Sequence, residues 1–145
     1  MATHVERDIF INVAPQTLFD YGMDATRSPE WYEGVVESTP DSKWPQVGGI
    51  AKQVYSTAGA RFDMTVTVKE YVPGKRFVFE MDGMINGTYQ WDYIPEGNGT
   101  RLKATVDYEM KGGALGQLAN KLVVERMNIG NLEKSLQNLK DNLEG

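Results

Sequence analysis

The chain has 145 residues, of which 41% are hydrophobic and 24% are charged, and this balance is typical of one folded domain. It contains no cysteine and one histidine, which excludes disulfides, zinc–thiolate centres, thiol nucleophiles and any metal site built on two histidines. The net charge of -5 disfavours nucleic acid as a partner, because the phosphate backbone would be repelled over most of the surface. We therefore expect a single domain over residues 1–145, without a metal or cofactor.

The beginning of the chain carries no sign of export. Its first eight residues are charged where a secretion signal would be apolar, and no stretch approaches the roughly 20 apolar residues of a membrane span. These features predict a cytoplasmic protein without integral membrane association.

The first predicted elements are a strand and two short helices. The stretch Val5–Val13 is rich in β-branched and aromatic residues, which favours a strand. Proline suits the first turn of a helix, so we expect a short helix over Pro15–Tyr21 that stops at Gly22. The stretch Ser28–Tyr32 repeats the arrangement, with serine as N-cap and proline in the first turn.

The middle of the chain, from Val35 to Met110, changes to a period of two. Apolar and polar residues alternate most clearly over residues 61–69 and 101–110, and glycine-containing turns separate the runs. This pattern predicts an antiparallel meander with one face in water. Pairing across the turn at residues 58–59 would put one set of side chains on a common face: Ala51, Gln53, Tyr55, Phe62 and Met64.

The last segment, Ala114 to about Glu144, has leucines spaced by three or four residues and predicts a helix about 45 Å long. Three charged residues, Glu125, Arg126 and Glu133, fall within or beside this apolar stripe. A lone buried charge is costly, so these residues pair with each other, reach solvent or contact a ligand.

A long helix against a curved sheet leaves space between the two layers, since a rod cannot follow the concave face. The side chains predicted to face inward are mostly Phe, Tyr, Trp and Met. Such residues line pockets for apolar ligands, and they fill a solid core equally well. From the residues alone, both a cavity and a filled core remain open.

The order of these elements and several turn motifs resemble the SRPBCC superfamily. This superfamily includes START-like lipid carriers, birch-pollen-allergen-like proteins and polyketide cyclase/dehydratases. The resemblance covers nearly the whole chain, and the matching motifs are Ile11-Asn12-Val13-Ala14-Pro15, Pro29-Glu30-Trp31, Pro45-Gln46-Val47-Gly48-Gly49, Glu70-Tyr71-Val72-Pro73-Gly74-Lys75-Arg76, Gly99-Thr100-Arg101-Leu102 and Leu136-Gln137-Asn138-Leu139-Lys140. It implies an α+β helix-grip fold, in which a curved antiparallel sheet of six to seven strands wraps around the long C-terminal helix. It also implies a deep apolar cavity between them.

On this basis we expect the chain to bind and transport a small apolar or amphipathic molecule, such as a lipid, an isoprenoid or an aromatic polyketide. The residues expected to contact it are Trp31, Tyr55, Phe62, Met64, Phe79, Tyr89, Trp91, Leu118, Leu122 and Arg126. We also expect Trp31 and Trp91 to report on ligand through their fluorescence.

Two other functions remain open, and the oligomeric state is not predicted. One is an enzyme of cyclase or dehydratase type that uses the same cavity, although no spacing of residues demands a reaction and no catalytic residue is assigned. The other is a protein-interaction module of chaperone-activator type that uses the outer face of the sheet. The mixed charges predicted for that face, among them Arg61, Asp63 and Lys69, disfavour it.

Overall fold

The computed structural model describes residues 3–57, 60–83, 85–110 and 121–145, apart from the side chains of residues 57, 60, 110 and 121–124. Its elements follow in this order: β1 (Thr3–Ile11), α1 (Pro15–Met23), the 3₁₀ turn η1 (Ala25–Arg27), α2 (Ser28–Trp31), β2 (Val35–Pro40), β3 (Ile50–Thr57), β4 (Ala60–Val72), β5 (Arg76–Asp82), β6 (Ile85–Glu96), β7 (Gly99–Met110) and α4 (Lys121–Glu144). The expected strand, short helices, six further strands and long helix are confirmed. The expected helix start at Ala114 lies outside the described residues.

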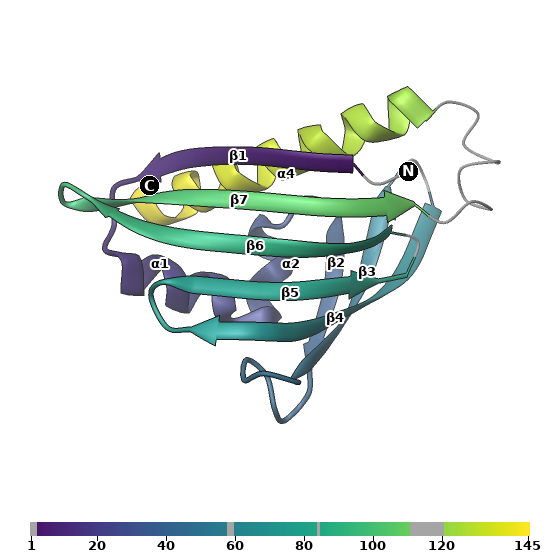
Figure 1. Cartoon of the computed structure of the whole chain (residues 1–145), viewed down its shortest axis with the longest axis horizontal. Helices are drawn as coiled ribbons and strands as arrows, with labels where there is room; N and C mark the ends of the chain where they lie inside the picture. The colour runs from purple at the N-terminus through teal and green to yellow at the C-terminus, as the bar shows by residue number, and fades with distance from the viewer. Residues whose placement is uncertain (1–2, 58–59, 84, 111–120) are drawn as a thin grey trace.

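The seven strands form one antiparallel sheet in the order β1-β7-β6-β5-β4-β3-β2 (Figure 1). The first strand therefore pairs with the last, and β2 to β7 form the predicted meander. The predicted register between β3 and β4 is confirmed, because Gln53 pairs with Met64 and Tyr55 pairs with Phe62. Ala51, Gln53 and Tyr55 are all buried on that face.

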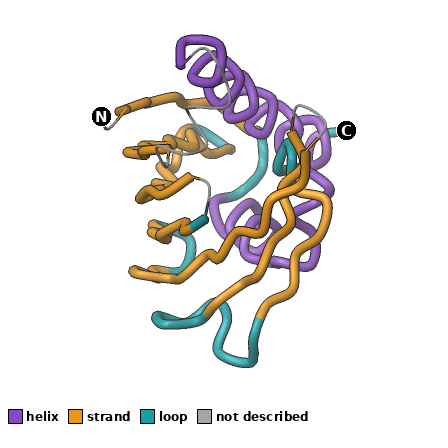
Figure 2. The backbone as a smooth tube through the Cα atoms, turned by 90° about the vertical axis from the view of Figure 1, so that its right-hand side faces the viewer, coloured by secondary structure: helices purple, strands orange, loops and turns teal. Residues whose placement is uncertain are grey.

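The sheet bends strongly around the helices, as Figure 2 shows. The register shifts between Val35 and Glu37 in β2, and again between Val68 and Glu70 in β4. An extra residue on one strand of a pair bends that strand and increases its twist. These two irregularities lie in β2 and β4, where the sheet curls towards α2.

The short helices differ from expectation at their ends. Helix α1 does not stop at Gly22 but continues to Met23, which is buried one turn after the buried Phe19. Packing of this apolar face outweighs the roughly 1 kcal/mol that a glycine costs inside a helix. Ser28 is the first residue of α2 rather than its N-cap, and the side chain of Asp24 caps the preceding turn η1 instead.

Helix α4 lies beside β1 and crosses the open side of the sheet (Figure 1). Its buried leucines, Leu132, Leu136 and Leu139, belong to the predicted stripe and face the core. None of the described helices combines the length and apolar character that a membrane span requires. The concave side of the sheet is thus covered by α1, α2 and α4, and any internal site lies between these helices and the strands.

Candidate functional site

Two small cavities lie between the sheet and the helices. The first, here called the tyrosine cavity, is lined by Tyr32, Tyr55, Tyr89, Tyr108, Asn128, Asn131 and the apolar residues Val5, Met81, Ile85, Val106, Ile129 and Leu132. The second, the tryptophan cavity, is lined by Trp31, Trp44, Trp91, Phe77, Phe79, Tyr93, Tyr32, Leu18, Gly22, Met23, Ser28, Gln53, Val66 and Leu139. Tyr32 contributes to both linings and therefore separates the two spaces.

Each cavity has a free volume of about 30 Å³, which is room for roughly two water molecules. Sites for drug-sized ligands typically measure about 300–1,000 Å³. The deep cavity implied by the resemblance is therefore not confirmed for the described residues. Aromatic rings occupy the space instead, as where Phe79 stacks on Tyr89 at 5.1 Å between centroids, and Trp31 meets Trp91 edge-on at 6.0 Å.

The hydroxyl groups in the tyrosine cavity are neutral hydrogen-bonding groups. Removal from water raises the pKa of Tyr32, Tyr55, Tyr89 and Tyr108 above the usual tyrosine value. The hydroxyls of Tyr32 and Tyr89 are close enough to influence each other's pKa. The amide of Asn131 donates to the oxygen of Tyr55. The hydroxyl protons of Tyr55 and Tyr89 thus stay bound at neutral pH and can be donated further.

Two buried donors lack a hydrogen-bond partner in the described part of the chain: the indole Nε1 of Trp31 and the hydroxyl of Tyr108. The side chains of Thr3 and Asn128 are polar neighbours of the Tyr108 hydroxyl, and both lower its pKa against the larger effect of burial. An unsatisfied buried polar group costs about 1–3 kcal/mol. Unpaired groups of this kind in a packed interior need an explanation.

Helix α4 holds the segment around Tyr32 with a row of polar side chains. Ser135 accepts a hydrogen bond from the backbone N–H of Glu33 at 2.8 Å, and Asn138 donates to the carbonyl of Trp31 at 3.0 Å. Asn142 donates to the carbonyl of Glu30 at 3.2 Å. The backbone on both sides of Tyr32 is thereby fixed to the helix.

This polar row, with Tyr32, is the part of the site that sequence reasoning missed. Its members recur at helical spacing, next to the leucine stripe: Asn131, Ser135, Asn138 and Asn142. Small polar residues at intervals of four, three and four on a helix form one face, so the spacing could have indicated a polar contact.

The structure places five of the ten predicted contact residues at the cavities. Tyr55 and Tyr89 line the tyrosine cavity, while Trp31, Phe79 and Trp91 line the tryptophan cavity. Two more, the buried Met64 and the half-buried Phe62, line neither. Leu118 and the side chain of Leu122 lie outside the described residues.

The prediction that Arg126 faces inward is wrong, because its side chain is exposed on α4. Glu133 is also exposed, and its carboxylate pairs with the guanidinium of Arg7 on β1 at 2.9 Å. Glu125 accepts a hydrogen bond from Thr3 at 3.0 Å. The cause is the rotation of α4 about its axis, which turns Glu125 and Glu133 towards the edge strand β1 and leaves Arg126 exposed.

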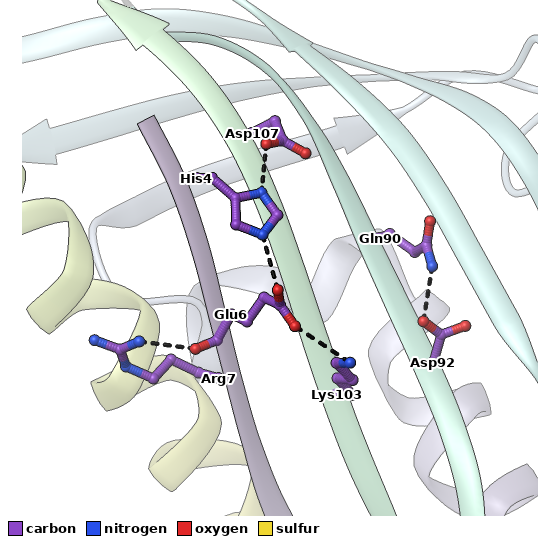
Figure 3. Close-up of polar contacts among 7 residues, drawn as sticks. All are labelled: His4, Glu6, Arg7, Gln90, Asp92, Lys103 and Asp107. Carbon is purple, nitrogen blue, oxygen red and sulfur yellow. Dashed lines mark hydrogen bonds and ion pairs between the residues drawn. The ribbon is translucent and has the colours of Figure 1, made fainter. Parts of the chain in front are cut away.

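The outer face of the sheet carries paired charges rather than an apolar patch. His4 contacts Asp107 and Glu6, and Glu6 also pairs with Lys103 at 3.2 Å (Figure 3). Within the described ranges, no cluster of three or more histidine, aspartate and glutamate side chains is arranged to hold a metal ion. A charged and self-paired surface disfavours the partner-binding function.

The His4 contacts predict a pH-dependent contribution to stability. The hydrogen bond with Glu6, followed by that with Asp107, raises the pKa of His4 above its ordinary value of 6.5. Stabilisation by the charged imidazole is thus complete below the unfolded pKa and is lost as pH rises through the folded one. We expect the urea midpoint of wild type to exceed that of His4→Gln at about pH 5.5, and the difference to close by about pH 8.5. A difference that stays constant or grows with pH would contradict this assignment.

Comparison with known proteins supports this architecture. The chain matches the family model "Polyketide cyclase / dehydrase and lipid transport" over residues 2–144. No sequence among curated proteins matches it. Among solved structures, the Zhui aromatase/cyclase from Streptomyces sp. R1128 is similar with a TM-score of 0.83 and 12% identity, over 99% of this chain and 94% of that one.

Two further structures share the fold. TTHA0849 from Thermus thermophilus has a TM-score of 0.79 and 22% identity, over 96% of this chain and 95% of that one. The di-domain aromatase/cyclase StfQ, from the steffimycin biosynthetic pathway, has a TM-score of 0.81 and 18% identity; 97% of this chain aligns with 50% of StfQ, so this chain spans half the length of that protein. Family model, topology and neighbours agree, and the chain belongs to the polyketide cyclase/dehydrase and lipid transport family within the SRPBCC superfamily.

Proposed function

We propose that the chain binds a small, largely apolar molecule between the sheet and α4, at the two aromatic cavities. The observation that carries this proposal is the pair of buried, unpartnered donors, Trp31 Nε1 and the Tyr108 hydroxyl, in linings that are otherwise mainly apolar. A mostly apolar lining with a few convergent polar groups is the usual composition of a small-molecule site.

Binding requires the cavities to enlarge, because about 30 Å³ accommodates no such molecule. The ligand would take the place of aromatic side chains that now fill the space. It would then satisfy the donors that the free protein leaves unpaired, and this gain offsets part of the cost of moving the rings.

Binding is favoured over acid–base catalysis by the chemistry of the lining. Every described side chain that lines the two cavities is uncharged. Burial raises the pKa of Tyr89 and Tyr93, so these phenols act as hydrogen-bond donors rather than as bases near neutral pH. The names of Zhui and StfQ describe cyclisation by those proteins, and they support ring-containing molecules as the first ligands to test.

Native mass spectrometry of the purified protein tests the proposal directly, and we expect a co-purifying small molecule. Titration with flavonoids, quinones, sterols and fatty acids should also shift tryptophan emission for at least one class. All three indoles line the tryptophan cavity, so Trp44 is expected to respond together with Trp31 and Trp91. An unliganded mass, together with unchanged emission for every class, would refute the proposal.

A further inference from the structure

We infer that the two cavities are halves of one elongated site, and that its occupant is an uncharged, ring-containing molecule with a hydrogen-bond acceptor at each end. This inference rests on the proposed function and assigns its ligand class. One acceptor would pair with Trp31 Nε1 in the tryptophan cavity, and the other with the Tyr108 hydroxyl in the tyrosine cavity.

The two donors are built into the core rather than left at a surface. Trp31 is 6% exposed and Tyr108 is 5% exposed, and both polar atoms lack a partner among the described residues. A site that presents a buried donor discriminates strongly against molecules that lack the matching acceptor, because the donor then stays unpaired.

The donors lie in different halves of the combined space, since Tyr108 lines only the tyrosine cavity and Trp31 only the tryptophan cavity. Trp31 packs against Trp91 on β6, whereas Tyr108 on β7 pairs with Gly87 of β6. Trp91 follows Gly87 by four positions, which corresponds to about 13 Å along an extended strand. Two linked aromatic rings with a carbonyl at each end have a comparable length.

Tyr32 is the partition between the halves. Its side chain lines both cavities and neighbours Tyr89 in the tyrosine cavity. Because Ser135 and Asn138 hold the backbone on either side, the ring can turn about its side-chain bonds while the chain stays in place. Displacing this ring joins the two spaces.

The charge of the ligand follows from the lining. All described lining residues are uncharged, and Arg126, the one charged residue among the expected ligand contacts, is exposed on α4. A carboxylate inside this site would lose its hydration without gaining a counter-ion. Neutral carbonyl, ether or phenolic oxygens match the two donors without that penalty.

A series of related probes tests the inference by calorimetric titration: biphenyl, its mono-acetyl derivative, its para,para′-diacetyl derivative and the corresponding dicarboxylate. For wild type we expect each acetyl group to strengthen binding about tenfold, the gain of one hydrogen bond to a buried donor. The dicarboxylate should bind more weakly than biphenyl itself.

Substitutions then assign the donors. Trp31→Phe and Tyr108→Phe should each reduce the affinity for the diacetyl probe to about that of the mono-acetyl probe, and the double variant should bind all three neutral probes equally. Trp91→Phe and Tyr55→Phe remove similar atoms from the same cavities, and there the ratio between diacetyl and unsubstituted biphenyl should persist. Tyr32→Ala should strengthen binding of all three neutral probes by a similar factor.

The outcomes separate this inference from the proposed function. Equal affinity of wild type for the three neutral probes, or tighter binding of the dicarboxylate, would overturn the inference and leave binding itself intact. Retention of the acetyl effect in the double variant would reassign the donors and equally overturn it. Weaker binding of the neutral probes to Tyr32→Ala than to wild type would refute the role of Tyr32 as the partition between the two cavities. Failure of every probe, with an unliganded native mass, would remove the proposed function as well.

Discussion

Leu139→Ala is expected to lower the free energy of unfolding by about 3 kcal/mol, within the range of about 2–5 kcal/mol for leucine truncation in cores. Leu139 is 2% exposed, lies in the C-terminal third of α4, and lines the tryptophan cavity. Truncation removes apolar contacts and leaves space that the surrounding rings fill only in part. Urea denaturation monitored by circular dichroism measures the loss.

The matched control for this variant is Leu143→Ala, one turn later on the same helix. Leu143 is only partly buried, so its truncation should cost clearly less. Leu139→Ala should also bind biphenyl more tightly than wild type, since the tryptophan cavity is then larger. Equal losses for the two variants, or weaker biphenyl binding by Leu139→Ala, would contradict the assigned position of Leu139.

Gly34→Ala should be similarly destabilising, by about 3 kcal/mol, for two additive reasons. Gly34 has a φ of +98°, a conformation that costs a residue with a side chain roughly 1–2 kcal/mol. A Cβ atom there would also stand 2.5 Å from the ring of Tyr55. Pushing this ring aside disturbs a packed core, which typically costs about 1–3 kcal/mol.

The control for Gly34→Ala is Gly97→Ala in the turn between β6 and β7. Gly97 has a φ of +59°, and a Cβ atom there would meet nothing within 4 Å. Only the backbone penalty of roughly 1–2 kcal/mol applies. Comparison of urea midpoints isolates the cost of moving Tyr55, whose hydroxyl is held by Asn131. If the two alanine variants lose the same stability, the contact between Gly34 and Tyr55 carries none of the effect.

A filled interior is compatible with the proposed ligand because the aromatic rings leave two buried hydrogen-bond donors without a partner. The rings pack closely, as between Phe77 and Phe79 at 5.6 Å, yet two donors among them stay unpaired. A core that served packing alone could replace Tyr108 by phenylalanine and lose that penalty. The unpaired groups therefore favour a ligand-binding interior over a purely structural one.

The fold was readable from the sequence because its signals are local. Alternation along β7 places Leu102, Ala104 and Val106 on one face whatever else the chain does, since successive side chains of a strand point to opposite sides. Prolines and glycines in the turns then limit how the strands connect. The register of β3 against β4 followed for the same reason, and it is confirmed.

Only some of the residues that line the two cavities could be predicted from the sequence. Four of the five predicted residues that reach the cavities lie on strands, where alternation alone turns residues such as Tyr55, Tyr89 and Trp91 inward; the fifth, Trp31, lies in α2. Alternation could not tell which inward side chains border the remaining space, so Met64 and Phe62 were included although they line neither cavity.

What the sequence determined by itself was the set of elements, their order and the inward faces of the strands. The tertiary structure alone decided the rotation of α4, which exposes Arg126 and turns Asn131 and Ser135 inward, and the position of Tyr32 between the cavities. The physical reason is the distance along the chain over which each signal acts. Periodicity depends only on residues a few positions apart, and it decides which face of a helix or strand is apolar. The contacts around Tyr32 join residues about a hundred positions apart, and only packing of the curved sheet against the helices brings them together.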